Sequence, residues 1–126
     1  MPAVDTNVLV RLLTADDPDQ TERAEAFLNR GPVWVSTVVL VETTWVLNGV
    51  YGWTKAHLLA MLRTLTDSRQ FTVQEPLAVA AAIAIYSAGK ADFADCLALE
   101  LARANDQLPF ATFDAQAAKL PGAVKP

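Results

Sequence analysis

Hydrophobic positions along the chain follow two alternating patterns, which predict short strands separated by helices. Short, mostly apolar runs at residues 2–4, 33–35, 71–73 and 109–112 are predicted to be strands, and the run at 33–35 consists of β-branched and aromatic side chains. Between them, apolar residues recur every three or four positions, which indicates helices with one buried face. The alternation, with helix predominating, predicts an α/β sandwich in which a small, mostly parallel sheet is flanked by helices. Helices are expected from residue 6, from 19 to 30, from 36 to about 47, from 54, from 76 to 88, from 93 to 104 and from 114 to 119, and a tail or edge strand at 121–126.

Length and composition indicate one globular domain spanning residues 1–126. A chain of 126 residues falls within the usual size of a single domain and is long enough to bury a core. Its residues are 52% hydrophobic and 19% charged, which excludes the disordered, collagen-like and low-complexity classes.

Charge, cysteine content and the lengths of the apolar runs exclude further classes. The net charge of −4 excludes a basic protein held on nucleic acid by bulk electrostatics. The single cysteine, Cys96, cannot form an internal disulfide, which excludes a stapled secreted scaffold. Asp5 interrupts the first apolar run, and no run approaches the roughly 20 residues of a membrane helix. We therefore expect a cytoplasmic domain with neither a signal peptide nor a membrane partner.

Five acidic residues stand among apolar ones at positions where a parallel sheet presents functional groups. Asp5 and Asp114 each follow a predicted strand, and ligands bind beyond the carboxyl ends of parallel strands. Asp92 and Asp95 are three residues apart at a helix start, so both can face one side. Glu42 lies in an otherwise apolar helix, where burying a lone charge is costly, and this favours a functional role.

Each of these acids also has a purely structural interpretation. Asp5, Asp92 and Asp114 are suitable helix caps, and Asp95 in a first turn would interact favourably with the helix dipole. Glu42 could instead reach solvent from the edge of a half-buried helix or pair with an arginine. Taken one at a time, the aspartates are better explained by structure and Glu42 by function.

Considered together, the five acids indicate a site for a hard divalent cation. Carboxylates that share a pocket repel one another and must either take up protons or hold a cation. Ligands that are all oxygen favour Mg²⁺ or Mn²⁺ over zinc or copper. His57 has no second histidine with which to form a zinc site, and Cys96 has no base beside it and is expected in the core. Thr6 and Thr112 adjoin the acids and either orient a ligand or water or cap the backbone locally.

Four short motifs, in this order, resemble those of PIN-domain ribonucleases, most closely the compact VapC-type toxins of bacterial toxin–antitoxin pairs. Residues 4–9, VDTNVL, look like the opening of these ribonucleases, and Glu42 after the second strand matches their second acid. Residues 91–98, ADFADCLA, look like the third acidic motif, and residues 112–114, TFD, look like the fourth. The resemblance extends over essentially the whole chain.

The resemblance implies a PIN-like fold and a Mg²⁺- or Mn²⁺-dependent endoribonuclease acting on single-stranded RNA. In that family the metal-binding, catalytic quartet would fall on Asp5, Glu42, Asp95 and Asp114, with Asp92 as an accessory ligand or a cap. The resemblance also implies a VapB-type antitoxin as a partner and a homodimer.

Further polar residues lie beside these motifs. Thr6 and Asn7 fall on the family's polar positions next to the first acid. Lys90 precedes the third motif and is the basic residue best placed to contact RNA.

Two other functions stay open. A PIN-like fold could act without catalysis by sequestering a partner, although the retained acids argue against this. A phosphatase with an aspartate nucleophile would want a second aspartate at position 7, where this chain has Asn7.

Overall fold

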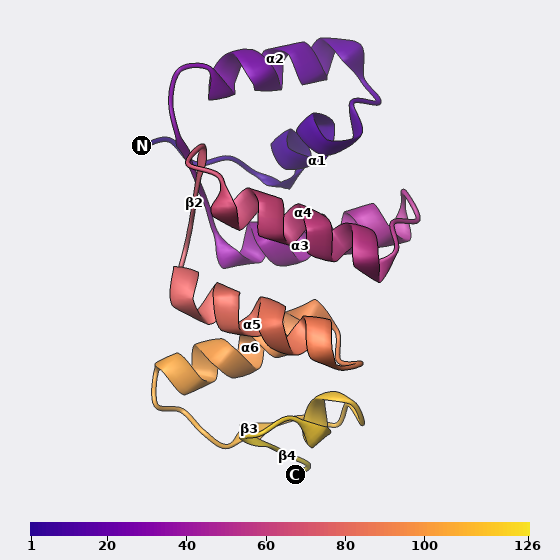
Figure 1. Cartoon of the computed structure of the whole chain (residues 1–126), viewed down its shortest axis with the longest axis vertical. Coiled ribbons are helices and arrows are strands. Elements are labelled where there is room, and N and C mark those ends of the chain that lie inside the picture. Colours follow the sequence, from indigo (N-terminus) through magenta and orange to yellow (C-terminus); the bar gives the residue numbers. More distant parts are fainter. The chain divides into compact units, whose positions relative to one another are not determined.

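A computed structural model describes all of residues 1–126, which form two compact units (Figure 1). Unit 1 is Met1–Gln74 and unit 2 is Glu75–Pro126. None of the helices combines the length and the apolar character needed to cross a membrane.

Unit 1 contains four helices and a two-stranded parallel sheet. Strands β1 and β2 pair in parallel, with Trp34 opposite Thr72. The strand predicted at residues 2–4 is reduced to a single parallel bridge between Ala3 and Trp34. The elements are α1 (Thr6–Thr14), α2 (Pro18–Leu28), β1 (Val33–Val35), α3 (Thr37–Gly49), α4 (Lys55–Asp67) and β2 (Phe71–Val73).

The helix starts of unit 1 are fixed by side-chain caps. The hydroxyls of Ser36 and Thr54 cap α3 and α4, so both helices begin where the sequence predicts. Helix α2 begins at Pro18, one residue before the predicted start, because Asp17 accepts the capping hydrogen bond that Asp19 was expected to accept. Pro18 occupies the first turn of α2, where its fixed φ suits a helix and its missing N–H costs nothing.

Unit 2 has two long helices that pack side by side (Figure 1), followed by a short parallel pair of strands. Phe110 of β3 lies opposite Ala123 of β4, so the expected edge strand forms. The helix expected at 114–119 is a turn followed by a 3₁₀ segment. The elements are α5 (Pro76–Ala88), α6 (Phe93–Ala104), β3 (Phe110–Ala111), η1 (Ala117–Lys119) and β4 (Ala123–Val124).

Helices and short parallel strands occur together in each unit of this chain, which confirms the predicted α/β class. The strands form two separate two-stranded sheets, one in each unit. Each unit also buries its own apolar side chains. The largest fully buried ones include Leu9, Val33, Val35, Leu40, Leu47 and Leu62 in unit 1, and Val79, Phe93, Leu97 and Leu99 in unit 2.

Arg103 ties the end of the chain to α6. Its Nε donates to Glu100 Oε2 at 2.9 Å, and its Nη2 donates to the Pro121 carbonyl at 2.5 Å. Gly122 has φ +92°, and a Cβ there would lie 3.1 Å from Arg103 Nη2, so only glycine fits without strain. These contacts of Arg103 fix the residues just before β4, and β4 in turn pairs with β3.

Core packing predicts a sharp contrast between two positions on α3. Leu40 is fully buried, whereas Val38 is 65% exposed. Leu40→Ala is expected to lower the free energy of unfolding by about 2–5 kcal/mol, because it leaves a cavity in a packed core. Val38→Ala, the matched control, is expected to change it by less than about 0.5 kcal/mol. Urea denaturation measures both, and equal losses would contradict the packing described.

Candidate functional site

Asp5 lies at the start of α1 and uses one carboxylate oxygen to cap it. Its Oδ1 accepts a hydrogen bond from the Val8 N–H at 3.2 Å. Negative charge is also favourable at this end of a helix, because the macrodipole is positive there. The side chain is exposed and its Oδ2 makes no hydrogen bond within the protein. The capping interpretation is therefore correct, and it leaves one oxygen open to a ligand.

Glu42 is held from α1 by a threonine hydroxyl. The Oγ1 of Thr6, a residue only 8% exposed, donates to Glu42 Oε2 at 3.1 Å. Thr6 directly follows Asp5, so this bond places Glu42 next to the start of α1. The expectation that Glu42 is buried is wrong, since its side chain lies on the exposed side of α3. The cost of burying a charge therefore does not argue for its function, but its bond to Thr6 leaves Oε1 open.

Asp114 is anchored in the turn that follows β3. Its Oδ1 accepts hydrogen bonds from the N–H groups of Gln116, at 3.0 Å, and Ala117, at 2.8 Å. The Thr112 hydroxyl in turn accepts from the Asp114 N–H at 3.1 Å, so Thr112 acts on the backbone. Asp114 is exposed and its Oδ2 makes no hydrogen bond within the protein.

Asp95 is the acid whose ionisation the fold opposes. It lies half-buried in the first turn of α6. Its pKa is raised, chiefly because burial removes water from the carboxylate and further because Asp114 and Asp92 are negatively charged. Asp92 occupies the N-cap position of α6, and its side chain makes no capping hydrogen bond there.

The predicted site residues thus gather in two groups. Asp5 and Glu42 are linked through Thr6 in unit 1, and Asp92, Asp95 and Asp114 interact electrostatically in unit 2. Neither group by itself brings three or more ligating side chains close enough to hold a metal ion. The accessory candidates Asn7, at the start of α1, and Lys90, in the turn before α6, are both exposed.

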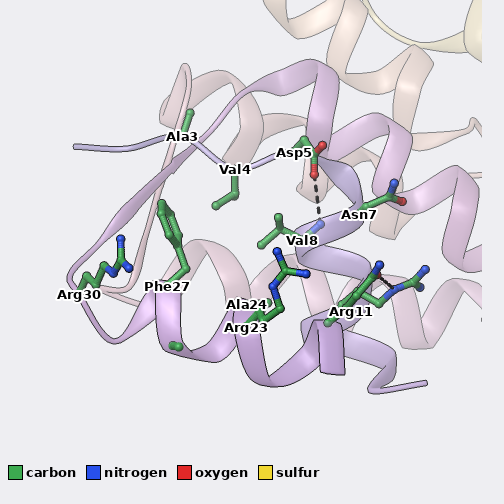
Figure 2. A pocket seen from close by; sticks show the side chains of 12 residues that line it. Ala3, Val4, Asp5, Asn7, Val8, Arg11, Arg23, Ala24, Phe27 and Arg30 are labelled. Carbon is green, nitrogen blue, oxygen red and sulfur yellow. Dashed lines mark hydrogen bonds between the residues drawn. The ribbon is translucent and has the colours of Figure 1, made fainter. Parts of the chain in front are cut away.

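A pocket in unit 1 contains functional candidates that sequence reasoning missed. It has a volume of about 800 Å³ and lies between α1 and α2, with Asp5 and Asn7 on its α1 side (Figure 2). Arg23 and Arg30 line its α2 side and were not singled out by the sequence. Their spacing with Phe27, at i, i+4 and i+7, was a usable signal, because such residues share one helix face.

The donor chemistry of the acids suits a divalent cation of the Mg²⁺ or Mn²⁺ type. Asp5, Glu42 and Asp114 each have one oxygen fixed by a hydrogen bond and one oxygen open, which orients the open oxygen as a metal ligand requires. A cation near Asp95 would also offset the repulsion that raises the pKa of that carboxyl.

The raised pKa of Asp95 predicts a pH-dependent stability. The folded state holds the Asp95 proton more tightly than the unfolded chain, so stability is lost as the pH rises from the ordinary aspartate pKa, about 3.9, through the raised value. Asp95→Asn is therefore expected to raise Tm in EDTA at about pH 7, with the gain disappearing at about pH 3, where the carboxyl is protonated in both states.

Thermal melts at both pH values measure this, with Asp67→Asn at the exposed end of α4 as the matched control. If Asp95→Asn does not raise Tm near neutral pH relative to Asp67→Asn, the Asp95 charge does not destabilise the fold, and the explanation given for its raised pKa is contradicted.

Comparison with known proteins identifies the family. A family model described as the PIN domain matches residues 3–123, a stretch that includes all five acids and most of both units. No curated protein and no solved structure matches the chain significantly. PIN domains are in general nucleases that need a divalent metal ion. Because the match covers almost the whole chain, the protein belongs to the PIN domain family.

Proposed function

We propose that this protein is a Mg²⁺- or Mn²⁺-dependent endoribonuclease that hydrolyses phosphodiester bonds in single-stranded RNA, with residues 1–126 acting as one PIN domain. The observation that carries the proposal is the way in which the fold holds three of the acidic side chains. Asp5, Glu42 and Asp114 each have one oxygen bound within the protein and one oxygen open. Family membership supports a metal-dependent nuclease, and the acids are the residues that its chemistry needs.

In this proposal Asp5, Glu42, Asp95 and Asp114 bind the metal and Asp92 is an accessory ligand. The Val8 N–H and the Thr6 hydroxyl hold the first two carboxylates, so less conformational entropy is lost when a ligand arrives. Asp95 contributes a carboxylate whose repulsion from its neighbours a cation relieves.

The chain's own residues support hydrolysis by water over a covalent route. When bound, a divalent ion supplies Lewis-acid polarisation of the phosphodiester. Cys96 is fully buried and directs its thiol at the Ala91 carbonyl, and His57 stacks on Trp53 with ring centroids 3.6 Å apart. Neither is presented as a nucleophile. The acids therefore act by holding the ion and by placing it against the phosphate.

The finer assignment is a VapC-type toxin that pairs with a VapB-type antitoxin and forms a homodimer. It is supported by the order of the four acidic motifs within a chain of 126 residues. Lys90 is exposed two residues before Asp92, where its ammonium can contact RNA beside the acids.

Removing one carboxylate tests the proposal. Asp5→Asn keeps a side-chain oxygen for the cap of α1 but removes the charge, and it is expected to lower Mg²⁺-dependent cleavage of single-stranded RNA by more than about 100-fold. It is also expected to relieve growth arrest on expression. Asp67→Asn, the matched control on α4, is expected to cleave like the wild type.

Two outcomes would contradict the proposal in different ways. A wild-type protein that cleaves no RNA with Mg²⁺ or Mn²⁺ would favour a silent binding module. Activity restricted to phosphate monoesters, in a parallel assay, would favour a phosphatase.

The bond from Thr6 to Glu42 predicts a positioning role. Thr6→Val keeps the shape but removes the donor, so the Glu42 carboxylate loses its hydrogen bond from α1. The Mg²⁺ concentration needed for half-maximal cleavage is expected to rise about 10- to 100-fold, while the rate at saturating Mg²⁺ falls much less. Thr6→Ser should behave like the wild type, and Thr72→Val, at an exposed position of β2, serves as the matched control. A fall in the saturated rate without a change in Mg²⁺ dependence would contradict positioning.

A further inference from the structure

The pocket between α1 and α2 combines an apolar floor with a basic side. Val4 and Ala24 are buried in its floor, and Phe27 is half-buried there. Three of the ten basic residues of the chain line it, against one carboxylate, that of Asp5. A chain with a net charge of −4 therefore carries a local surplus of positive charge beside its first acid. The three basic residues are Arg11, Arg23 and Arg30.

Arg11 is the fixed member of this set. Its Nε donates to Gln20 at 2.6 Å, and one of its Nη atoms lies 3.1 Å from Asp16 and 3.3 Å from the Tyr51 hydroxyl. These bonds connect the end of α1 to α2 and to the segment after α3. Arg11 therefore has a structural role, and its charge is balanced by Asp16.

Arg23 and Arg30 are available to a ligand. The side chain of Arg23 is 77% exposed, and its single ion pair, to Asp19, is long at 3.9 Å and weak because both groups are solvated. Arg30 is exposed and lies over the Phe27 ring, 5.6 Å from its centroid, with no carboxylate partner. Both guanidinium groups are drawn on the α2 side of the pocket in Figure 2.

This pattern fits the backbone of a single-stranded nucleic acid. Guanidinium groups bind phosphate through paired N–H donors and tolerate exposure while doing so. An aromatic ring with an arginine over it offers a stacking surface, and single strands combine such stacking with phosphate contacts. Asp5 lines the same pocket, so a strand lying there runs past a carboxylate that is proposed to bind the metal.

We propose that the α1–α2 pocket binds the phosphate backbone of single-stranded RNA, with Arg23 and Arg30 as its phosphate contacts, and directs the strand toward Asp5. The inference rests on the proposed ribonuclease function and adds the surface by which the substrate is held. An acidic protein segment is the competing occupant, and the experiment separates the two.

The test measures RNA binding apart from cleavage. An end-labelled oligouridylate of about twelve nucleotides is titrated in Mg²⁺ with protein carrying Asp95→Asn, which lies in unit 2 and leaves the pocket unchanged. Adding Arg23→Ala and Arg30→Ala is expected to reduce the slope of log affinity against log salt by about 1.4, since each phosphate contact contributes about 0.7 on a single strand. At about 0.1 M salt this corresponds to roughly 25-fold weaker binding.

Matched variants isolate the pocket from general electrostatics. Arg63→Ala with Arg69→Ala also removes two arginines from unit 1, so in the Asp95→Asn background both double variants take the net charge from −3 to −5. This control is expected to bind RNA within about twofold of its background. The double replacement Arg23→Lys and Arg30→Lys keeps the charges and is expected to retain most of the salt slope.

Three results would overturn the inference: equal losses in the pocket and control variants, no loss in either, or arginine-dependent binding of an oligoglutamate peptide without RNA binding. The proposed function fails on a different readout. Cleavage that survives both Asp5→Asn and Asp95→Asn would contradict the catalytic assignment, while the binding result would still decide the role of Arg23 and Arg30.

Discussion

Hydrogen bonds from the local backbone and from one threonine hydroxyl fix the carboxylates on which the proposed chemistry depends. The start of α1 holds Asp5 through the Val8 N–H, and the turn after β3 holds Asp114 through two N–H groups. A cap of this kind stabilises its helix by about 1 kcal/mol, so the acid contributes to folding before any ligand binds. Because each bond uses one oxygen, the same contact that stabilises the secondary structure also orients the second oxygen. In the proposed function, structural and metal-binding roles therefore coincide in one side chain.

Asp95 shows the opposite arrangement, and the contrast defines the electrostatics of the acids. It is half-buried and near two other carboxylates of its own unit, so its surroundings disfavour the negative charge. The surroundings of a capping acid, by contrast, stabilise its charge. A neutral side chain at this position would avoid the desolvation and the charge repulsion that Asp95 experiences, so stability alone does not explain an aspartate there. A carboxylate kept at a position that raises its pKa is a feature of sites that await a positive charge.

Much of the fold follows from local sequence signals, and the exceptions have physical causes. Apolar runs located α3, α4, α5 and α6. The capping hydroxyls of Ser36 and Thr54 mark the starts of α3 and α4, and Pro76 marks the start of α5. The exposure of Glu42 could not be predicted, because α3 is apolar on nearly all sides and its sequence does not indicate which side packs. Asp17 displaced Asp19 as the cap of α2 because Pro18 begins the helix. In the sequence, Arg23 and Arg30 look like ordinary solvent-exposed helix residues. Their place in a pocket depends on the packing of α1 beside α2, which the sequence does not show.

The most direct test of the central claim is Mn²⁺ binding followed by electron paramagnetic resonance, in which only the free aqueous ion gives the strong six-line signal. We predict that wild-type protein removes Mn²⁺ from solution at neutral pH. A variant combining Asp5→Asn, Glu42→Gln, Asp95→Asn and Asp114→Asn should leave the free signal as it is in buffer, with its fold verified by circular dichroism. Equal depletion of free Mn²⁺ by the two proteins, or none by the wild type, would contradict the assignment of these carboxylates as metal ligands.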